Sequence, residues 1–291
     1  MCGIVGYVGY RSAPVFLIEG LHRLEYRGYD SAGVAIHTDS GLEIRKKAGR
    51  VSQLEEAMEN SPIDGTVGIG HTRWATHGET TDTNSHPHFG GNAEVALVHN
   101  GVIENYATLR NQLQELGYVF HSQTDTEVVA HLIAHHVEER IKLGDNPEDP
   151  KTYARAVRAT TDRLKGTYGL AILFKKVPGL LIASRAGSPL VIGVGDGEFF
   201  IASDASPLVG YTKDVVYLQE HELVTLTSSE MHVEHRDNGR VSPSVQTLEQ
   251  VEGDSDLGEY EHYMLKEIYE QPQAIENALR CLLYTSPSPR D

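Results

Sequence analysis

Short apolar segments separated by polar turns run through most of the chain. Residues 4–8 form the first of them, and segments of similar length recur as far as residue 235, as is typical of β-strands. Asp-Ser-Gly at 39–41 lies between two segments and predicts a hairpin. Strands are expected at residues 4–8, 33–37, 42–46, 67–71, 95–99, 170–174, 181–184, 191–194, 199–202, 215–218, 223–227 and 231–235.

Other segments repeat their apolar residues at the three- and four-residue spacing of helices. Residues 13–25 have one apolar side, and Ser12 is suited to cap the start of this helix. The same spacing predicts helices at 106–116, 125–139 and 152–164. We therefore expect an α+β fold in which two antiparallel sheets stack face to face and helices flank them.

The pattern changes after about residue 240. Residues 241–260 are rich in Ser, Glu, Asp and Gly without periodicity, which predicts a linker, and residues 263–279 are helical in pattern again. The last eleven residues, CLLYTSPSPRD, continue neither pattern.

Composition excludes several classes of partner. The chain has 291 residues, 40% of them hydrophobic, and a net charge of −16, which argues against nucleic acid or an anionic membrane as a partner. Its only cysteines, Cys2 and Cys281, form no disulfide framework, and no apolar run is long enough for a membrane span. We expect a cytoplasmic enzyme.

Cys2 follows directly after Met1, and this position can make its thiol unusually reactive. Removal of Met1 places a free α-amine, with a pKa of about 7.7–8.0, beside a thiol with a pKa of about 8.5. The amine can then accept the thiol proton, so that one residue supplies both nucleophile and base. Taken alone, a cysteine at this position is more often a small residue of a first strand.

Five blocks, in order along the chain, carry a family resemblance. They read MCGIVG at 1–6, LEYRGYDSAG at 24–33, HTRWATHGE at 71–79, VHNGVIEN at 98–105 and QTDTE at 123–127. The chain resembles the class II glutamine amidotransferases, a branch of the N-terminal-nucleophile (Ntn) hydrolases. Within them it most resembles the glutaminase half of the glucosamine-6-phosphate synthases, the isomerizing glutamine-fructose-6-phosphate aminotransferases, and KEIYEQP at 266–272 continues the match.

The resemblance implies a four-layer αββα sandwich and a division of the chain into three parts. Residues 2–240 correspond to the glutaminase domain, residues 241–280 to a linker and the start of a missing sugar-isomerase region, and residues 281–291 to a tail that is not native sequence. L-Glutamine is then the substrate. Fructose 6-phosphate is a partner only through the missing region, the full-length enzyme is expected to be a homodimer, and no cofactor or metal is expected.

Two charged residues suit the zwitterionic ends of glutamine. Arg73 can bind an α-carboxylate through two parallel charged hydrogen bonds, although a strand-end arginine is often only a surface residue. Asp125 can bind the α-ammonium, although its position also suits a helix cap. The family resemblance favours both as substrate ligands.

Asn100 and Gly101 follow the strand expected at 95–99, where an Asn-Gly pair usually marks a tight turn. The alternative is catalytic, because an amide N–H of Asn100 and the backbone N–H of Gly101 can stabilise the oxyanion of a tetrahedral intermediate. Gly101 would leave room for the attacked carbon. The resemblance implies further site residues: Arg27 and Gly28 near the nucleophile, Trp74 as a gate on the movement of ammonia, and Thr76, His77 and His99 around glutamine.

Parts of the sequence also fit a metal site or another kind of glutamine-binding protein. His131 and His135 have ligand-like spacing, but no further motif completes a metal site, so a packed or solvated helix face is favoured. The glutaminase part of another synthase, such as an amidophosphoribosyltransferase, shares the chemistry but reads more like HRGQESAG in the arginine block. A glutamine-sensing module without turnover is the alternative of a different class.

Overall fold

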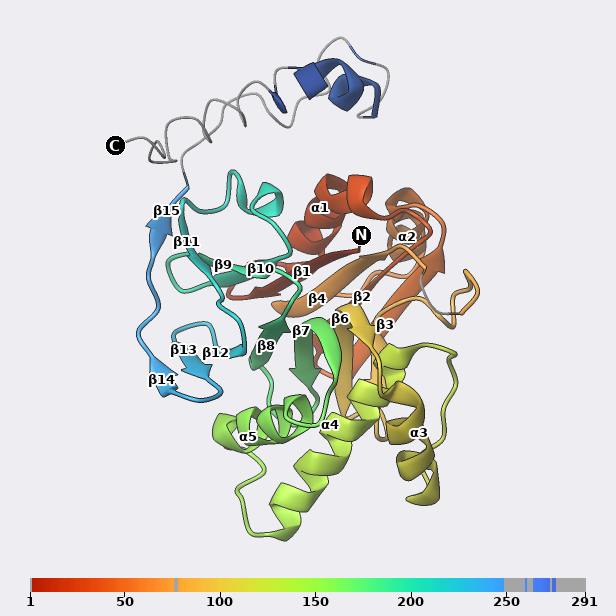
Figure 1. The fold of residues 1–291 in the computed structure, drawn as a ribbon, viewed down its shortest axis with the longest axis vertical. Coiled ribbons are helices and arrows are strands. Elements are labelled where there is room, and N and C mark those ends of the chain that lie inside the picture. Colours follow the sequence, from red (N-terminus) through yellow and green to blue (C-terminus); the bar gives the residue numbers. More distant parts are fainter. Residues whose placement is uncertain (1, 76–77, 249–259, 261–263, 273, 276–291) are drawn as a thin grey trace, which may run out of the picture. The chain divides into compact units, whose positions relative to one another are not determined.

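The computed structural model describes residues 2–75, 78–248, 260, 264–272 and 274–275, which are shown as coloured ribbon in Figure 1. The chain divides into two compact units, residues 1–249 and 250–291. In the second unit the described residues 264–272 and 274–275 are helical, as the pattern predicts. No helix in the described ranges combines the length and the apolar character needed to cross a membrane.

The first sheet of the larger unit carries the N-terminal strand near its middle. β1 pairs antiparallel with β10 on one side and with β4 on the other. The residue that precedes β1 is therefore surrounded by neighbouring strands. In spatial order the sheet contains β15 (Gln246–Thr247), β11 (Asp214–Tyr217), β9 (Val191–Val194), β10 (Phe199–Ala202), β1 (Gly3–Val8), β4 (Val67–Arg73), β2 (Ser31–Thr38) and β3 (Gly41–Ala48).

The second sheet is also antiparallel throughout its described pairs, and β6 and β7 form its longest ladder. In spatial order it contains β14 (Gly239–Val241), β13 (Met231–His235), β12 (Glu222–Leu226), β8 (Leu181–Ala186), β7 (Gly166–Phe174), β6 (Val95–Ile103) and β5 (His88–Gly90).

Alternation of side chains along the strands builds the layers. In β1, Ile4 and Val8 pack into a core shared by both sheets, whereas Val5 and Tyr7 pack with the helices on the opposite face. Helices α1 and α2 lie on one side of the strands and α3, α4 and α5 on the other (Figure 1). Their bounds are α1 (Ala13–Leu24), α2 (Val51–Asn60), α3 (Tyr106–Glu115), α4 (Asp125–Lys142) and α5 (Pro150–Thr161).

These layers confirm the αββα sandwich, and the predicted strands and helices are all present within a few residues. Helix α2 was not predicted, although Val51, Leu54 and Met58 have helical spacing and are buried. The expected side-chain cap is wrong: Ser12 is the N-cap residue of α1, but its hydroxyl accepts no hydrogen bond from the helix and donates to Asp64 Oδ1, 3.4 Å away. Strands β14 and β15 also extend the sheets beyond the boundary expected at residue 240.

Candidate active site

Cys2 immediately precedes β1 and is half-buried against the end of β4. The backbone N–H of Trp74 donates to its Sγ at 3.2 Å, and the thiol lies 3.6 Å from the carbonyl oxygen of the same residue. Burial raises the pKa of the Cys2 thiol, against the lowering effect of the Trp74 N–H. The thiol is therefore protonated at neutral pH and needs a base before it can attack as a thiolate.

The segment that holds the thiol is itself fixed by the turn before β2. The carboxylate of Asp30 accepts from the backbone N–H of Ala75, and the N–H of Asp30 donates to the Arg73 carbonyl at 3.1 Å. Gly28 packs against the same segment, where an added Cβ would lie 2.9 Å from the carbonyl carbon and oxygen of Arg73. A side chain at residue 28 would therefore displace the backbone that contacts Cys2.

Asn100 joins the N-terminus to the second sheet. Its buried amide nitrogen donates to the Cys2 carbonyl and to Ser203 Oγ, both at 3.1 Å. Its Oδ1 lies 3.0 Å from Nε2 of His71, which also faces the His99 carbonyl at 3.0 Å. Burial lowers the pKa of His71 to about 3, so the ring is neutral and its hydrogen sits on Nε2 between these two acceptors.

Asn100 and Gly101 lie inside β6, and the expectation that they follow its end is wrong. They pair with Gly169 and Tyr168 of β7. Gly101 has φ of +134°, and an added Cβ would lie 2.1 Å from the carbonyl oxygen of Thr167. Glycine is thus required by the backbone and by the neighbouring strand, a stronger reason than the space for an attacked carbon that the sequence suggested.

A small cavity opens beside the thiol, with about 20 Å³ of space, enough for one water but not for glutamine. Six of the predicted residues line the cavity, together with three that were not predicted: Cys2, Arg73, Trp74, His99, Gly101 and Asp125, with His86, Thr124 and Thr126.

The cavity has charges of both signs. Arg73 is buried at the end of β4, and its guanidinium donates to the carbonyl oxygens of Glu79 at 3.3 Å and Gly78 at 3.5 Å. Asp125 is the first residue of α4, and its Oδ2 accepts from the backbone N–H of Ile103 at 2.8 Å. A guanidinium and a carboxylate at one small cavity match the carboxylate and ammonium of an amino acid.

The remaining predicted residues have different positions. His99 is buried, with Nδ1 3.0 Å from Thr126 Oγ1. Trp74 is half exposed and contacts Tyr29 edge to face. Arg27 does not line the cavity, and its guanidinium forms an ion pair with Asp204 at 2.9 Å. Thr76 and His77 lie outside the described residues.

Several residues of the site were missed. Four of them lie inside the recognised sequence blocks, so their position in a block could have indicated that they belong to the site: Asp30, His71, Thr124 and Thr126. No sequence pattern indicates Ser203. Its Oγ accepts from the backbone N–H of Ile4 at 2.6 Å, and only the fold brings these two residues together. Among the described residues, no group of three or more His, Cys, Asp or Glu side chains is arranged to hold a metal ion.

Comparison with known proteins shows which proteins this chain resembles. The glutamine amidotransferase domain family matches residues 71–210. A glutamine–fructose-6-phosphate aminotransferase (isomerizing) of Bacteroides thetaiotaomicron is 48% identical over 283 residues, which are 96% of this chain and 44% of that protein. The enzyme of the same name from Acinetobacter baylyi is 49% identical over 279 residues, with the same coverage.

This chain belongs to the glutamine amidotransferases. Among solved structures, a glutamine phosphoribosylpyrophosphate amidotransferase from B. subtilis, complexed with ADP and GMP, aligns with a TM-score of 0.67 and 28% identity. The alignment covers 81% of this chain and 49% of that one, and it confirms the Ntn-type sandwich. This glutamine amidotransferase chain spans 44% of the length of the curated relatives named above.

Proposed function

We propose that this glutamine amidotransferase chain hydrolyses the side-chain amide of L-glutamine, with Cys2 as the nucleophile. The observation that carries the proposal is that Cys2, Arg73 and Asp125 line one cavity. Arg73 binds the substrate carboxylate and Asp125 its ammonium, which directs the carboxamide toward the thiol. His99, Trp74, Thr76 and His77 complete the glutamine pocket, while Arg27 and Gly28 support the nucleophile.

In the proposed reaction, the α-amine of Cys2, freed by removal of Met1, takes the thiol proton, and Sγ attacks the amide carbon of glutamine. The carbon–nitrogen bond breaks as the amine returns its proton to the leaving ammonia, and a γ-glutamyl thioester remains. Water then attacks the thioester, and glutamate and the free thiol result. The raised pKa of Cys2 explains why a base beside the thiol is needed.

The oxyanion is stabilised by the backbone N–H of Gly101 and the side-chain amide of Asn100. The Asn100 amide donates to the carbonyl of Cys2 in the free chain, so it exchanges this bond for the oxyanion during the reaction. His71 orients the amide, because its Nε2–H faces Asn100 Oδ1 and leaves the amide nitrogen directed toward Cys2. Loss of one such donor typically lowers kcat by a factor of about 10² to 10³.

For the longer protein, we propose that the ammonia reaches fructose 6-phosphate to form glucosamine 6-phosphate, as the names of the relatives suggest. The supporting observation is the identity of 45–49% to several such enzymes, against 28% to the phosphoribosylpyrophosphate enzyme. A cytoplasmic location and a homodimer of the longer protein stay predictions. Within this chain, residues 2–248 are proposed as the glutaminase domain, which extends the earlier boundary to include β15.

Glutamate release from the purified chain tests the proposed function. Cys2→Ala is expected to abolish hydrolysis, whereas Cys281→Ala, which removes the other cysteine of the chain, keeps the parental rate. Fructose 6-phosphate added with glutamine should give no amino sugar from this chain. Turnover by Cys2→Ala at more than about a tenth of the parental rate would refute the nucleophile. Glutamine binding to a parent that has lost Met1 but shows no turnover would favour a sensing module.

A further inference from the structure

Behind the catalytic cavity, a buried carboxylate holds the segment that leads into α4. Glu127 Oε1 accepts from the backbone N–H of His121 at 2.8 Å, and Oε2 accepts from the N–H and hydroxyl of Ser122 at 2.6 and 2.7 Å. The side chain of Glu127 is 4% exposed. Three hydrogen bonds to one buried carboxylate are far more than a helix cap requires.

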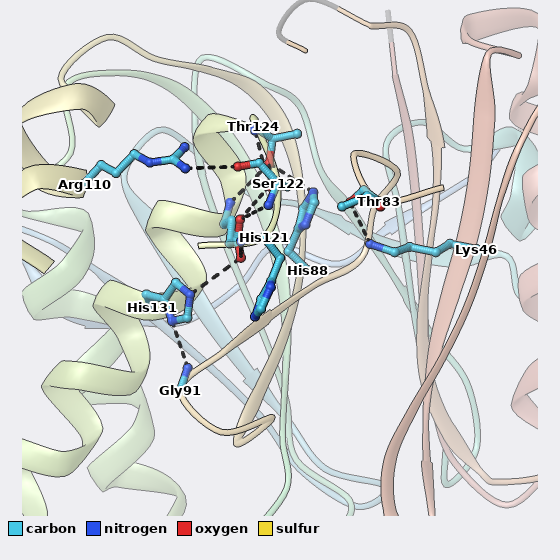
Figure 2. A network of polar contacts seen from close by, with 10 residues as sticks. Lys46, Thr83, His88, Gly91, Arg110, His121, Ser122, Thr124 and His131 are labelled. Atoms are coloured by element: carbon cyan, nitrogen blue, oxygen red, sulfur yellow. Dashed lines mark hydrogen bonds and ion pairs between the residues drawn. The ribbon is translucent and has the colours of Figure 1, made fainter. Parts of the chain in front are cut away.

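This network connects directly to residues of the catalytic cavity. The hydroxyl of Ser122 lies 2.9 Å from Thr124 Oγ1, which in turn lies 3.1 Å from Nε2 of His88 (Figure 2). Thr124 caps α4, and Thr124, Asp125 and Thr126 line the cavity. The segment that Glu127 holds, residues 121–122, therefore leads directly through Thr124 to Asp125.

The carboxylate is charged at neutral pH. Burial alone raises the pKa of Glu127, but the nearby His131 ring and the hydrogen bonds from His121 and Ser122 outweigh burial and lower the pKa to about 2. His131 Nδ1 accepts from the backbone N–H of Gly91 at 3.1 Å, so its hydrogen lies on Nε2, 3.7 Å from Glu127 Oε1 (Figure 2). A neutral substitute cannot accept from all of these donors.

Glu127 does not line the catalytic cavity. It borders a separate cavity of about 820 Å³ on the other side of the network, together with Ser122, His88 and His131. A direct contact with glutamine in the catalytic cavity is therefore not its role.

We propose that Glu127 is a positioning residue for substrate recognition: it fixes residues 121–124 so that the carboxylate of Asp125 faces the ammonium of glutamine. The proposal rests on the proposed function, in which Asp125 binds that ammonium. In Glu127→Gln, the amide nitrogen faces a backbone N–H or a hydroxyl, so one acceptor is lost and two donors oppose each other. The entry segment and Asp125 then shift together.

The test compares glutamine with 4-carbamoylbutanoate, which is glutamine without its α-ammonium. Both are hydrolysed at the same amide, so the ratio of their kcat/KM values reports recognition of the ammonium and does not depend on the fraction of folded enzyme. We expect Glu127→Gln to lower this ratio about tenfold, through KM for glutamine with kcat changed less than about threefold. Asp125→Asn should lower the ratio at least as much.

Glu138→Gln is the matched control, because this glutamate lies on the same helix and borders the same large cavity, but its side chain is 53% exposed. It should keep the parental ratio. Ser122→Ala retains the carboxylate and removes the hydroxyl that links it to Thr124, and it should lower the ratio about threefold. If Glu127→Gln does not fold, the ratio measured for Ser122→Ala decides whether this network positions Asp125.

A parental ratio in Glu127→Gln, or in Ser122→Ala where that variant decides, overturns the positioning role while leaving glutamine hydrolysis intact. An unchanged ratio in Asp125→Asn shows that the ammonium contact was wrongly assigned, and the positioning role falls with it. A parent that has lost Met1 and hydrolyses no glutamine refutes the proposed function itself.

Discussion

Substitution of Gly101 by alanine perturbs both the backbone and the strand beside it. An alanine at φ of +134° is strained by about 1–3 kcal/mol. Its Cβ would lie 2.1 Å from the Thr167 carbonyl oxygen, so β6 and β7 must separate locally by about 1 Å, at an overpacking cost of about 1–3 kcal/mol. Backbone strain and overpacking each lower the melting temperature, by about 2–4 °C for each kcal/mol of lost stability.

The displacement also moves the proposed oxyanion donors. A misplacement of about 1 Å can reduce the rate about 10²-fold, and we expect a loss of this size in kcat for Gly101→Ala. Gly117→Ala is the matched control, because Gly117 has φ of +90° but nothing within 4 Å of an added Cβ. It should lower the melting temperature through backbone strain alone and leave kcat unchanged.

Thermal denaturation and saturation kinetics of glutamate release measure both effects. The parent, Gly101→Ala and Gly117→Ala are compared under the same conditions, so that stability and catalysis are separated. If kcat of Gly101→Ala stays within about threefold of the Gly117→Ala value, the proposed oxyanion site at Gly101 is wrong.

Three further predictions concern the pocket, the pH dependence and the boundary of the domain. Arg73→Ala and Asp125→Asn should mainly raise KM for glutamine, because each binds a group remote from the reacting carbon, and an unchanged KM in both would show that the pocket is misplaced. The folded-state pKa of Glu127, about 2, lies below the usual value of about 4.3, so its stabilisation is complete above that value and is lost as the pH falls toward 2. The titratable side chains next to Glu127 are Lys46, His88 and His131. Urea unfolding at several pH values should therefore show that the difference in unfolding free energy between the parent and Glu127→Gln becomes smaller in acid. A difference that stays constant with pH contradicts a charged Glu127. A chain ending at residue 240 loses β15 and should melt at a lower temperature than a chain ending at residue 248; equal melting temperatures would show that β15 contributes no stability.

The sequence predicted the strands and helices because their periodicities are local, whereas the four-layer αββα arrangement was implied by the family resemblance. β6 illustrates both success and failure: Ala96 and Val98 alternate with Val95 and Leu97 between two cores, as the pattern indicates, but the strand continues through Asn100-Gly101. Pairing with β7 overrides the turn preference of that dipeptide, and pairing between distant segments cannot be read from a window of residues.

The candidate site could likewise be predicted where its residues lie in recognisable sequence blocks, but not where only the fold brings them together. Arg73 and Asp125 belong to recognisable blocks, and the structure brings both to the cavity beside Cys2. Ser203 lies 103 residues from Asn100 along the chain, and only the neighbouring strands bring the two into a hydrogen bond. The buried carboxylate of Glu127 was visible in the QTDTE block as a helix-start residue, but its reach back to residues 121 and 122 depends on the tertiary path of that loop.

The central claim, that Cys2 with a free α-amine carries out the reaction, can be tested by trapping its intermediate. The chain is mixed with glutamine, quenched in acid within the first turnover, digested and analysed by mass spectrometry. If Cys2 is the nucleophile, the digest contains an N-terminal peptide that begins at Cys2, lacks Met1 and carries one γ-glutamyl group on the thiol. Hydrolysis by a chain that retains Met1, or an adduct on any residue other than Cys2, would contradict the claim.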